Sequence, residues 1–292
     1  MSIPKIKNHN KLSVIIPTFN SGEYIHTCIF SLKESLNMIG MDHEIIVIDN
    51  NSNDSTVDVL EREENVSLLK LSQNVGFAKS VNMGIRRASG NLFLILNPDT
   101  RPQKASLINL HKCMMKSGSG IVGGLSYRRD RTIHGSFVRK PSLLTLLFDY
   151  SNLRKIVPGD VIHKQHYYQD RKVPNDQMYV DIVSGSFMMI DKKVVEKIGY
   201  FDENFFMYLE DVDFCVRALK ENIVVSLCPE SKIFHEGGAS SKNEDRILHS
   251  AWDKSRRYYS KKHFGFISNM IIQPIFVIDS LLTRLWQSLK SR

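Results

Sequence analysis

The fold of this chain is limited above all by residues 12–96, where short apolar runs alternate with amphipathic segments. The apolar runs are rich in β-branched side chains and predict buried strands at residues 12–16, 44–48, 67–71 and 92–96. Between them, apolar side chains recur at spacings of three and four, which predicts helices over residues 25–36 and 78–88. Strands that alternate with helices favour an α/β fold with a mostly parallel central sheet flanked by helices.

Polar loops follow three of these strands, with the sequences PTFN, DNNSND and NPD. Ligands of parallel sheets bind outside the carboxyl ends of the strands, so we expect the three loops to form one site. Asn97 and Asp99 should project to the same side of a strand end, and Pro98 holds Asn97 extended. One amide and one carboxylate suit Mg²⁺ or Mn²⁺ with open positions for phosphate oxygens; an ordinary turn is the alternative.

The loop that begins at Asp49 can offer a carboxylate to a nucleobase N–H, and amide or hydroxyl groups to a ribose. The alternative is a polar loop whose Asp54 or Ser55 caps the next helix. No GxGxxG follows the first strand and no GxxxxGK[ST] occurs in the chain, which argues against a nicotinamide dinucleotide and against a P-loop nucleotidase.

The stretch FMYLEDVDFCVRALK predicts a helix that begins near Glu210, because apolar residues recur there with a helical period. Asp213 and Arg217 are spaced i,i+4 and should pair, which indicates a structural role. Glu210 and Asp211 follow an aromatic run, and a partly desolvated carboxylate of this kind can act as a general base. His235 follows an apolar pair, after a further strand predicted at 223–227, and is another candidate.

The carboxyl-terminal region differs in composition from the rest of the chain. From residue 254 to 292 it holds eight Lys or Arg and one acid, so it carries most of the net charge of +8. This charge lies beside an interrupted apolar run at 264–283, which indicates an amphipathic helix at an anionic membrane surface rather than nucleic-acid binding. A helix packed on the catalytic domain or on a second subunit, as in a homodimer, is the alternative.

Four cysteines without paired spacing, and an amino terminus without an apolar segment, predict a reduced, cytoplasmic compartment without a signal peptide. The basic tail would place the protein peripherally at the inner face of the cell membrane. Residues 125–178 show no periodicity from which elements can be assigned.

Several motifs occur in an order typical of one family: SVIIPTFN, VIDNNSND, NVGFAKSVNMGI, LNPDT, GSFMMI, FFMYLEDVDFCVR and FHEGG. Between about residues 12 and 240 the chain therefore resembles glycosyltransferase family 2, with the GT-A fold. FFMYLEDVDFCVRALK, the late HEGG and SRRYYSKKHFG are most similar to the rhamnosyltransferase branch. The resemblance implies a GT-A (Rossmann-like) domain at 1–250, with a nucleotide-binding half at 10–105 and an acceptor half at 106–250. A C-terminal helical extension would follow at 251–292.

The resemblance also implies roles for individual residues. Asp211 would be the catalytic base, with Glu210 as the less favoured candidate. Asp99 would hold Mg²⁺ or Mn²⁺, and His235 would contact the metal or the diphosphate. Asn97 stands where the family carries the first acid of its metal motif. The nucleotide sugar would be bound by Pro17, Thr18, Asn20, Asp49, Asn51, Asn74, Gly76, Lys79, Asn82 and Asn97.

The function that this resemblance implies is transfer of a sugar with inversion, from a nucleotide-sugar donor to a hydroxyl of a lipid-linked or polysaccharide acceptor. The branch points to L-rhamnose from dTDP-rhamnose in cell-surface glycan synthesis. Transfer of glucose, galactose or N-acetylglucosamine from a UDP donor is the alternative. A glycan-binding module without turnover, or a sugar-nucleotide pyrophosphorylase, would be rivals of another class. The presence of both Asp99 and Asp211 argues against the first rival, and the lack of a Gly- and Arg/Lys-rich loop after the first strand argues against the second.

Overall fold

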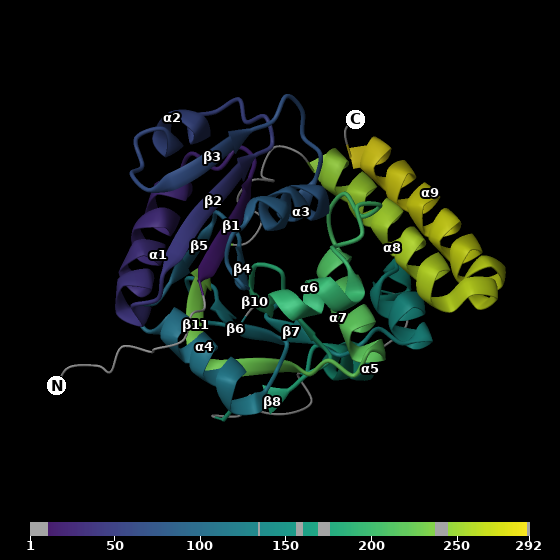
Figure 1. The fold of residues 1–292 in the computed structure, drawn as a ribbon. Helices are drawn as coiled ribbons and strands as arrows, with labels where there is room; N and C mark the ends of the chain where they lie inside the picture. Colours follow the sequence, from purple (N-terminus) through teal and green to yellow (C-terminus); the bar gives the residue numbers. More distant parts are fainter. Residues whose placement is uncertain (1–10, 134, 156–159, 169–175, 237–244, 291–292) are drawn as a thin grey trace.

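The computed structural model describes residues 11–133, 135–155, 160–168, 176–236 and 245–290. Its centre is a sheet with the strand order β3-β2-β1-β4-β10-β6-β11-β5, in which β8 pairs with β11 (Figure 1). The four strands expected from the amino-terminal pattern are confirmed as mutually parallel neighbours: β1 (Leu12–Thr18), β2 (His43–Asp49), β3 (Val66–Lys70) and β4 (Leu92–Leu96).

Helices cover both faces of this sheet, as the apolar periodicity requires. Successive residues of β1 alternate between two cores: Val14 and Ile16 belong to one, and Ile15 belongs to the other. Strands that are buried on both faces have no polar side, which explains why their sequences are continuously apolar. The first core is covered by α1 (Ile25–Ile39), α2 (Thr56–Leu60) and α4 (Ser106–Ser117), and the second by α3 (Phe77–Arg87), α6 (Lys192–Ile198) and α7 (Glu210–Lys220).

The second half of the sheet mixes strand directions. β10 (Phe187–Asp191) runs antiparallel to both β4 and β6 (Ile121–Tyr127), and β6 pairs in parallel with β11 (Val225–His235). The apolar stretch 180–190 is therefore two strands in different sheets, because β9 (Ile182–Val183) pairs with β7 (Phe137–Val138) outside the main sheet. The short β5 (Thr100–Pro102) closes the edge by pairing antiparallel with β11.

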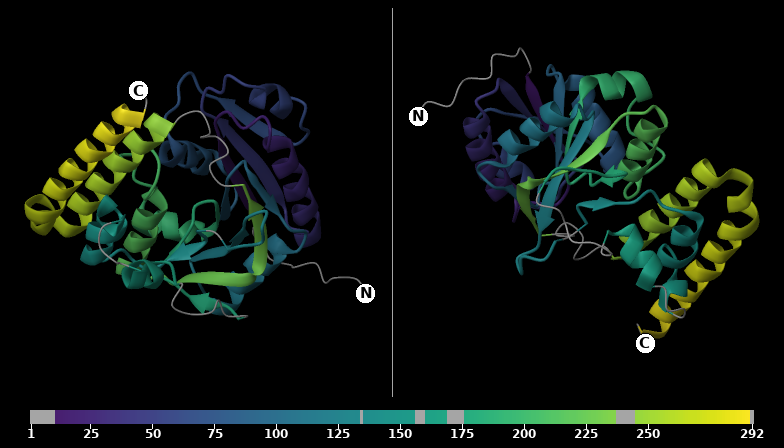
Figure 2. Two further views of the ribbon diagram at one scale, coloured as in Figure 1. Left: turned by 180° about the vertical axis from the view of Figure 1, so that it is seen from behind. Right: turned by 90° about the horizontal axis from the view of Figure 1, so that it is seen from below.

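The stretch 125–178, which has no readable periodicity, contains short and irregular elements. They are η1 (Thr145–Asp149), η2 (Asn152–Lys155), α5 (Asp160–His166) and β8 (Met178–Tyr179). Figure 2 shows these helices beside the carboxyl-terminal hairpin of α8 (Asp245–Ile267), η4 (Ser268–Ile272) and α9 (Gln273–Lys290).

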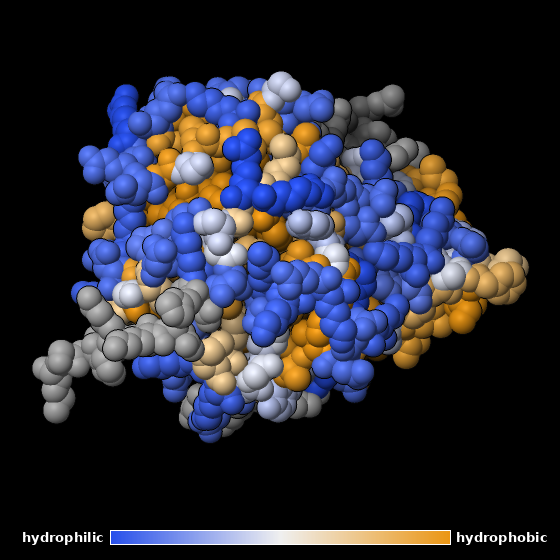
Figure 3. All heavy atoms as spheres, viewed as in Figure 1, coloured by the Kyte–Doolittle hydropathy of each residue, from blue (hydrophilic) through white to orange (hydrophobic). Residues whose placement is uncertain are grey.

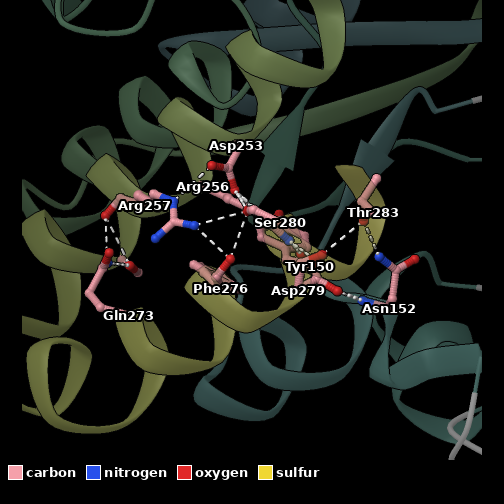
Figure 4. Close-up of polar contacts among 11 residues, drawn as sticks. Tyr150, Asn152, Asp253, Arg256, Arg257, Gln273, Phe276, Asp279, Ser280 and Thr283 are labelled. Atoms are coloured by element: carbon pink, nitrogen blue, oxygen red, sulfur yellow. Dashed lines mark hydrogen bonds and ion pairs between the residues drawn. The ribbon is translucent and has the colours of Figure 1, made fainter. Parts of the chain in front are cut away.

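A buried polar network holds this hairpin to the rest of the chain (Figure 4). Arg256 is 4% exposed; its Nη1 donates to Asp279 at 2.7 Å and to the carbonyl oxygen of Tyr150 at 2.6 Å. Asp253 binds both Arg256 and Arg257. The sequence suggested that the basic residues before the apolar run would face a membrane. That expectation is wrong for these two arginines, because each is committed to an internal carboxylate.

The cysteines also correct a sequence-based expectation. Cys113 on α4 and Cys228 on β11 form a disulfide, although their spacing of 115 residues gave no sign of pairing. Cys28 and Cys215 are free and buried. The pairing of β11 beside α4 brings the two chain segments together, and sequence spacing alone contains no such information.

Candidate functional site

A cavity of about 490 Å³ opens at the carboxyl ends of β1 and β4. The strand order reverses between these two strands, since β2 and β3 lie on one side of β1 and the later strands on the other. Such a switch point is where ligands bind in open α/β sheets. The predicted residues that line the cavity are Pro17, Thr18, Asn74, Gly76, Asn97, Asp99, Glu210, Asp211 and His235.

Hydrogen bonds of side chains that do not themselves line the cavity hold the PTFN and DNNSND loops in place. Asn20 accepts from the backbone N–H of Asn53 at 3.0 Å, and its own N–H donates to Ser52 Oγ at 2.9 Å. The carboxylate of Asp49 accepts from the backbone N–H and the hydroxyl of Ser52. Asn20 and Asn51 both have positive φ, which asparagine tolerates better than most residues. These three predicted residues shape the loops around the cavity.

Asn50 lines the cavity in their place and was not predicted from the sequence. Its Oδ1 accepts from Ser80 Oγ at 2.7 Å and from the N–H of Val75 at 3.2 Å, and its Nδ2 donates to the carbonyl oxygen of Thr18 at 3.3 Å. One amide thus ties the ends of β1 and β2 to the start of α3. The run of polar residues at 49–54 gave no signal for which member would face inward.

Gly76 brings the start of α3 against the loop that precedes the two acids. Its φ is 86°, and a Cβ there would lie 2.3 Å from the carbonyl oxygen of Phe206. The next N–H, that of Phe77, donates to this same oxygen at 2.7 Å. Only glycine permits so close an approach, so steric contact with Phe206 requires a glycine at residue 76.

Two predicted residues of α3 lie away from the cavity lining. Asn82 is fully buried, and its amide donates to the carbonyl oxygen of Phe201 at 2.8 Å and accepts from the N–H of Phe201 at 3.0 Å. Lys79 is exposed on the same helix. Asn82 therefore holds the 200–206 loop, and we leave both residues out of the candidate site.

Asp99 and His235 meet in the cavity although 136 positions separate them in the sequence. The antiparallel pairing of β5 and β11 places His235 opposite Thr100, and its Nε2 lies 3.2 Å from Asp99 Oδ1. Within the described ranges, no group of three or more His, Cys, Asp or Glu could hold a metal. Two protein ligands are nevertheless enough for a cation that keeps waters and is completed by substrate phosphates, so the pair fits such an ion.

Glu210 and Asp211 lie at the start of α7, where the preceding backbone is strained. Tyr208 and Leu209, which precede α7, both have positive φ, at 70° and 67°. Two consecutive left-handed residues that are not glycine cost energy and are found most often at functional sites. They place Glu210 and Asp211 in the first turn of α7. There Asp211 accepts from the N–H of Gly185 at 2.9 Å and from that of Val212 at 2.8 Å.

The two adjacent carboxyl groups differ in their surroundings. Glu210 is 6% exposed, and its Oε2 has no hydrogen-bond partner in the part of the chain that the structure describes. Burial, and then the charge of Asp211, raise the pKa of Glu210 well above its ordinary value. Burial also raises the pKa of Asp211, but the hydrogen bonds from Gly185 and Val212 oppose that rise. The hydrogen bonds therefore favour the ionised form of Asp211, whereas Glu210 has no such support for its charge.

Asp213 has the structural role predicted for it. Arg217 donates to it at 2.8 Å, and two residues of α8, Lys262 and His263, bind its other oxygen at 2.7 and 2.9 Å. Asp213 is fully buried, and burial alone would favour its neutral form; the hydrogen bonds from His263, Lys262 and Arg217 outweigh this and lower its pKa. Asp213 therefore fastens the carboxyl-terminal hairpin to the helix that carries Glu210 and Asp211.

The other end of the cavity is aromatic and was not predicted. Its wall comes from β7, from the irregular elements after it and from α8, with Phe137, Val138, Tyr150, His166, Tyr167, Leu248, Ala251 and Trp252. The rings of Tyr150 and Trp252 pack edge to face with their centroids 5.1 Å apart. The wall residues of α8 precede the SRRYYSKKHFG motif and the other segments carried none, so sequence reasoning had no signal with which to find this wall.

Comparison with known proteins gives distant but consistent relatives. The chain is 28% identical over 235 residues to a low-salt glycan biosynthesis hexosyltransferase, Agl10, of Haloferax volcanii; the match covers 77% of this chain and 66% of that protein. It is 26% identical to the dTDP-rhamnosyl transferase RfbF of Shigella flexneri, over 86% of this chain and 77% of RfbF. It is 24% identical to the N-acetylglucosaminyl-diphospho-decaprenol L-rhamnosyltransferase of Mycobacterium tuberculosis, over 87% and 86% of the two chains.

The comparison with solved structures and the family models agree with the names of these relatives. The crystal structure of S. aureus TarS 1–349 superposes with a TM-score of 0.52 at 18% identity, and the match covers 89% of this chain and 73% of that one. The model of glycosyl transferase family group 2 matches residues 162–290. The model of glycosyl transferase family 2 matches residues 13–199, which is more than half of the sequence. The chain therefore belongs to glycosyl transferase family 2.

Proposed function

We propose that this protein is an inverting, metal-dependent glycosyltransferase that moves L-rhamnose from dTDP-rhamnose to a hydroxyl of a lipid-linked acceptor. The observation that carries the proposal is that one cavity holds the Asp99–His235 pair and the Glu210–Asp211 pair. The choice of sugar is supported by the names of two relatives, a dTDP-rhamnosyl transferase and an L-rhamnosyltransferase that acts on a decaprenol-linked sugar.

In the proposed reaction, an acceptor hydroxyl attacks the anomeric carbon of the donor. The bond from that carbon to the diphosphate oxygen breaks as the new bond forms on the opposite face, which inverts the configuration. Asp211 takes the hydroxyl proton, and its backbone hydrogen bonds keep the carboxylate ionised and oriented. Glu210 stays protonated beside it, so that two like charges do not share the site.

Asp99 and His235 would hold Mg²⁺ or Mn²⁺ at the diphosphate end, with Asn97 beside them. The bound ion would offset the negative charge that grows on the leaving diphosphate. Thr18 and Asn74 line the same end of the cavity and would contact the nucleoside.

The proposal is tested by offering the purified protein dTDP-rhamnose, UDP-glucose, UDP-galactose and UDP-N-acetylglucosamine, each with Mg²⁺ or Mn²⁺. Binding is followed by the shift in melting temperature, since a ligand that binds only the native state stabilises it. We expect the largest shift with dTDP-rhamnose and none with any donor in chelator. A larger shift with a UDP-sugar would reassign the donor, and no shift with any of them would contradict a nucleotide-sugar enzyme.

We further propose that the carboxyl-terminal hairpin rests on a membrane. Large apolar side chains are exposed along its outer side and at its turn, and Figure 3 shows them gathered over α8 and α9: Phe266, Ile267, Met270, Ile271, Val277, Ile278, Leu281 and Leu282. This is more apolar surface than monomers usually leave in water, and a lipid-linked acceptor would be met at that surface. Residues 248–283 are also long and apolar enough to cross a membrane, by length and composition alone.

Sedimentation with liposomes tests this contact. Phe266→Ser with Leu282→Ser should release the protein from vesicles of anionic phospholipid, while Tyr179→Ser, at an exposed apolar residue on the sheet edge, should not. If the double variant instead stays bound to the vesicles, the face does not bind lipid. If it loses a dimer that the parent forms in solution, the face is a subunit interface.

A further inference from the structure

The aromatic end of the cavity has no part in the donor site proposed above. Its wall joins two parts of the chain that are far apart in sequence: Tyr150, His166 and Tyr167 come from the irregular elements, and Leu248 and Trp252 come from α8. The hairpin is therefore part of the active-site cavity, whether or not its outer face touches a membrane.

His166 supplies the polar group in this wall. It is 3% exposed, and its Nδ1 has no hydrogen-bond partner within the described residues. Burial lowers the pKa of His166 to about 4, so its ring is neutral at neutral pH and offers one donor and one acceptor. Buried polar atoms are normally paired, and an unpaired one requires an explanation. Thr18 Oγ1 and Glu210 Oε2 are likewise unpaired among the described residues and line the same cavity, which suggests that ligands supply the missing partners.

The aromatic wall is held firmly and lies next to the acids. The indole of Trp252 packs edge to face on Tyr150 at 5.1 Å and on Tyr208 at 5.9 Å, and Tyr208 is two residues before Glu210. Arg256 fixes the backbone of Tyr150 through its carbonyl oxygen. Trp252 is half-buried, so part of it remains available to a ligand.

We infer that this aromatic end is the acceptor subsite, and that it binds a pyranose ring. The apolar C–H face of the sugar would lie against Trp252, and one ring hydroxyl would pair with Nδ1 of His166. Apolar walls with a few placed polar groups are the usual construction of such a site. The inference rests on the proposed function, because only a transferase needs a second sugar beside Asp211. It makes Trp252 and His166 determinants of acceptor specificity.

The inference can be tested with an intrinsic reporter. The chain has two tryptophans, so Trp286→Phe leaves Trp252 as the only one. Its emission is measured, with dTDP and Mg²⁺ present, during titration with the methyl glycosides of glucose, galactose, N-acetylglucosamine and rhamnose, and with n-octanol for comparison. We expect a saturable change with at least one glycoside. His166→Ala should weaken that binding about fivefold, the size of one hydrogen bond, and Tyr179→Ala should not change it.

Two results would overturn the inference: a response to n-octanol alone, which would assign the wall to an alkyl chain, or no response to any glycoside. Binding of dTDP, measured by calorimetry on the same samples, separates the two proposals. If dTDP binds and glycosides do not, the acceptor subsite is wrong and the donor site stands. If dTDP and dTDP-rhamnose fail to bind, the proposed function fails first.

A kinetic measurement gives a second readout once an acceptor is in hand. Trp252→Ala should raise the KM for the acceptor about tenfold, the order that one lost aromatic stack contributes, with a smaller change in the KM for the donor. Trp252→Phe should restore most of the loss. An equal rise in both KM values would mean that Trp252 supports the whole cavity and does not select the acceptor.

Discussion

The two ends of the cavity are built in different ways. The proposed donor end lies on β1, β2 and β4, whose parallel pairing brings the polar loops to one edge of the sheet, where Asn20, Asp49 and Asn50 hold them by hydrogen bonds. The aromatic end lies on short irregular elements and on α8, which are held by edge-to-face rings and by a buried ion pair. The first end therefore depends on a regular scaffold, and the second on irregular, long-range contacts.

Asp211 lies where the two ends meet, so its replacement should have the largest effect. Asp211→Asn keeps the shape but cannot take a proton, and we expect turnover to fall by about 10²–10⁴-fold with donor affinity and melting temperature near the parent values. Glu210→Gln is the matched control and should be milder, because Glu210 is already protonated. The reverse order would make Glu210 the base. Parent-like turnover in both variants would remove the pair from the chemistry.

The aromatic end can be destabilised by a substitution outside the cavity wall. Asp279→Ala removes one of the two carboxylates that compensate the buried Arg256. Loss of one partner of a buried ion pair typically costs about 3–5 kcal/mol, and Asp253, which stays bonded, should reduce this cost. We expect a lower melting temperature and easier proteolysis of the hairpin. Replacing both partners, with Arg256→Met and Asp279→Leu, should recover much of the stability, since no unpaired charge is then left. If the single and double variants are equally unstable, charge burial is not the cause.

The donor end should respond to Asp99 in a different way. Asp99→Ala should weaken donor binding about 30-fold or more, because loss of a charged partner to a buried group costs about 2 kcal/mol or more. Acceptor binding to the aromatic end should change little, which calorimetry with separate ligands would show. Asn97→Asp adds a carboxylate beside Asp99 instead of removing one. It should lower the concentration of Mn²⁺ needed for half-maximal activity. Full activity of Asp99→Ala in chelator would disprove the metal assignment.

The smallest expected effect concerns pH. Because its pKa is raised, folded Glu210 keeps a proton that the unfolded chain releases near pH 4.3, so stability falls as pH rises from there toward the raised pKa. Glu210→Gln cannot lose this proton. Its melting temperature should therefore match that of the parent near pH 4 and exceed it at pH 8. A constant difference across this range would mean that Glu210 does not titrate differently on folding.

The sequence predicted the parallel half of the sheet and the start of α7 well, because periodicity and strand-end loops report local geometry. It found the four parallel strands, the start of α7 near Glu210 and the pairing of Asp213 with Arg217. It did not separate residues that shape a loop from those that face a ligand. Asn20, Asp49 and Asn51 shape their loops, whereas Asn50 lines the cavity, and only the φ angles and partners of the folded chain distinguish them.

The aromatic end and the Cys113–Cys228 disulfide could not be predicted, for a different reason. Both depend on residues that are separated by more than 80 positions and show no repeating pattern. The basic tail was misread in part. Arg256 and Arg257 count toward the positive charge of the tail, but Asp253, three and four residues before them on α8, pairs with both, which their spacing allowed. The second partner of Arg256, Asp279, becomes visible only when α8 and α9 are folded together.

Asp213 is synthesised before two of the residues that bind it, so its contacts are completed only as translation proceeds. Asp213 lies on α7, but Lys262 and His263 emerge from the ribosome later, after a few seconds of translation at about 5–20 residues per second. During that interval the buried carboxylate has only Arg217 to compensate it, and the helix that carries Asp211 lacks its final support. We expect the nascent chain to remain inactive until α8 and α9 are released, so that a chain without them does not consume donor.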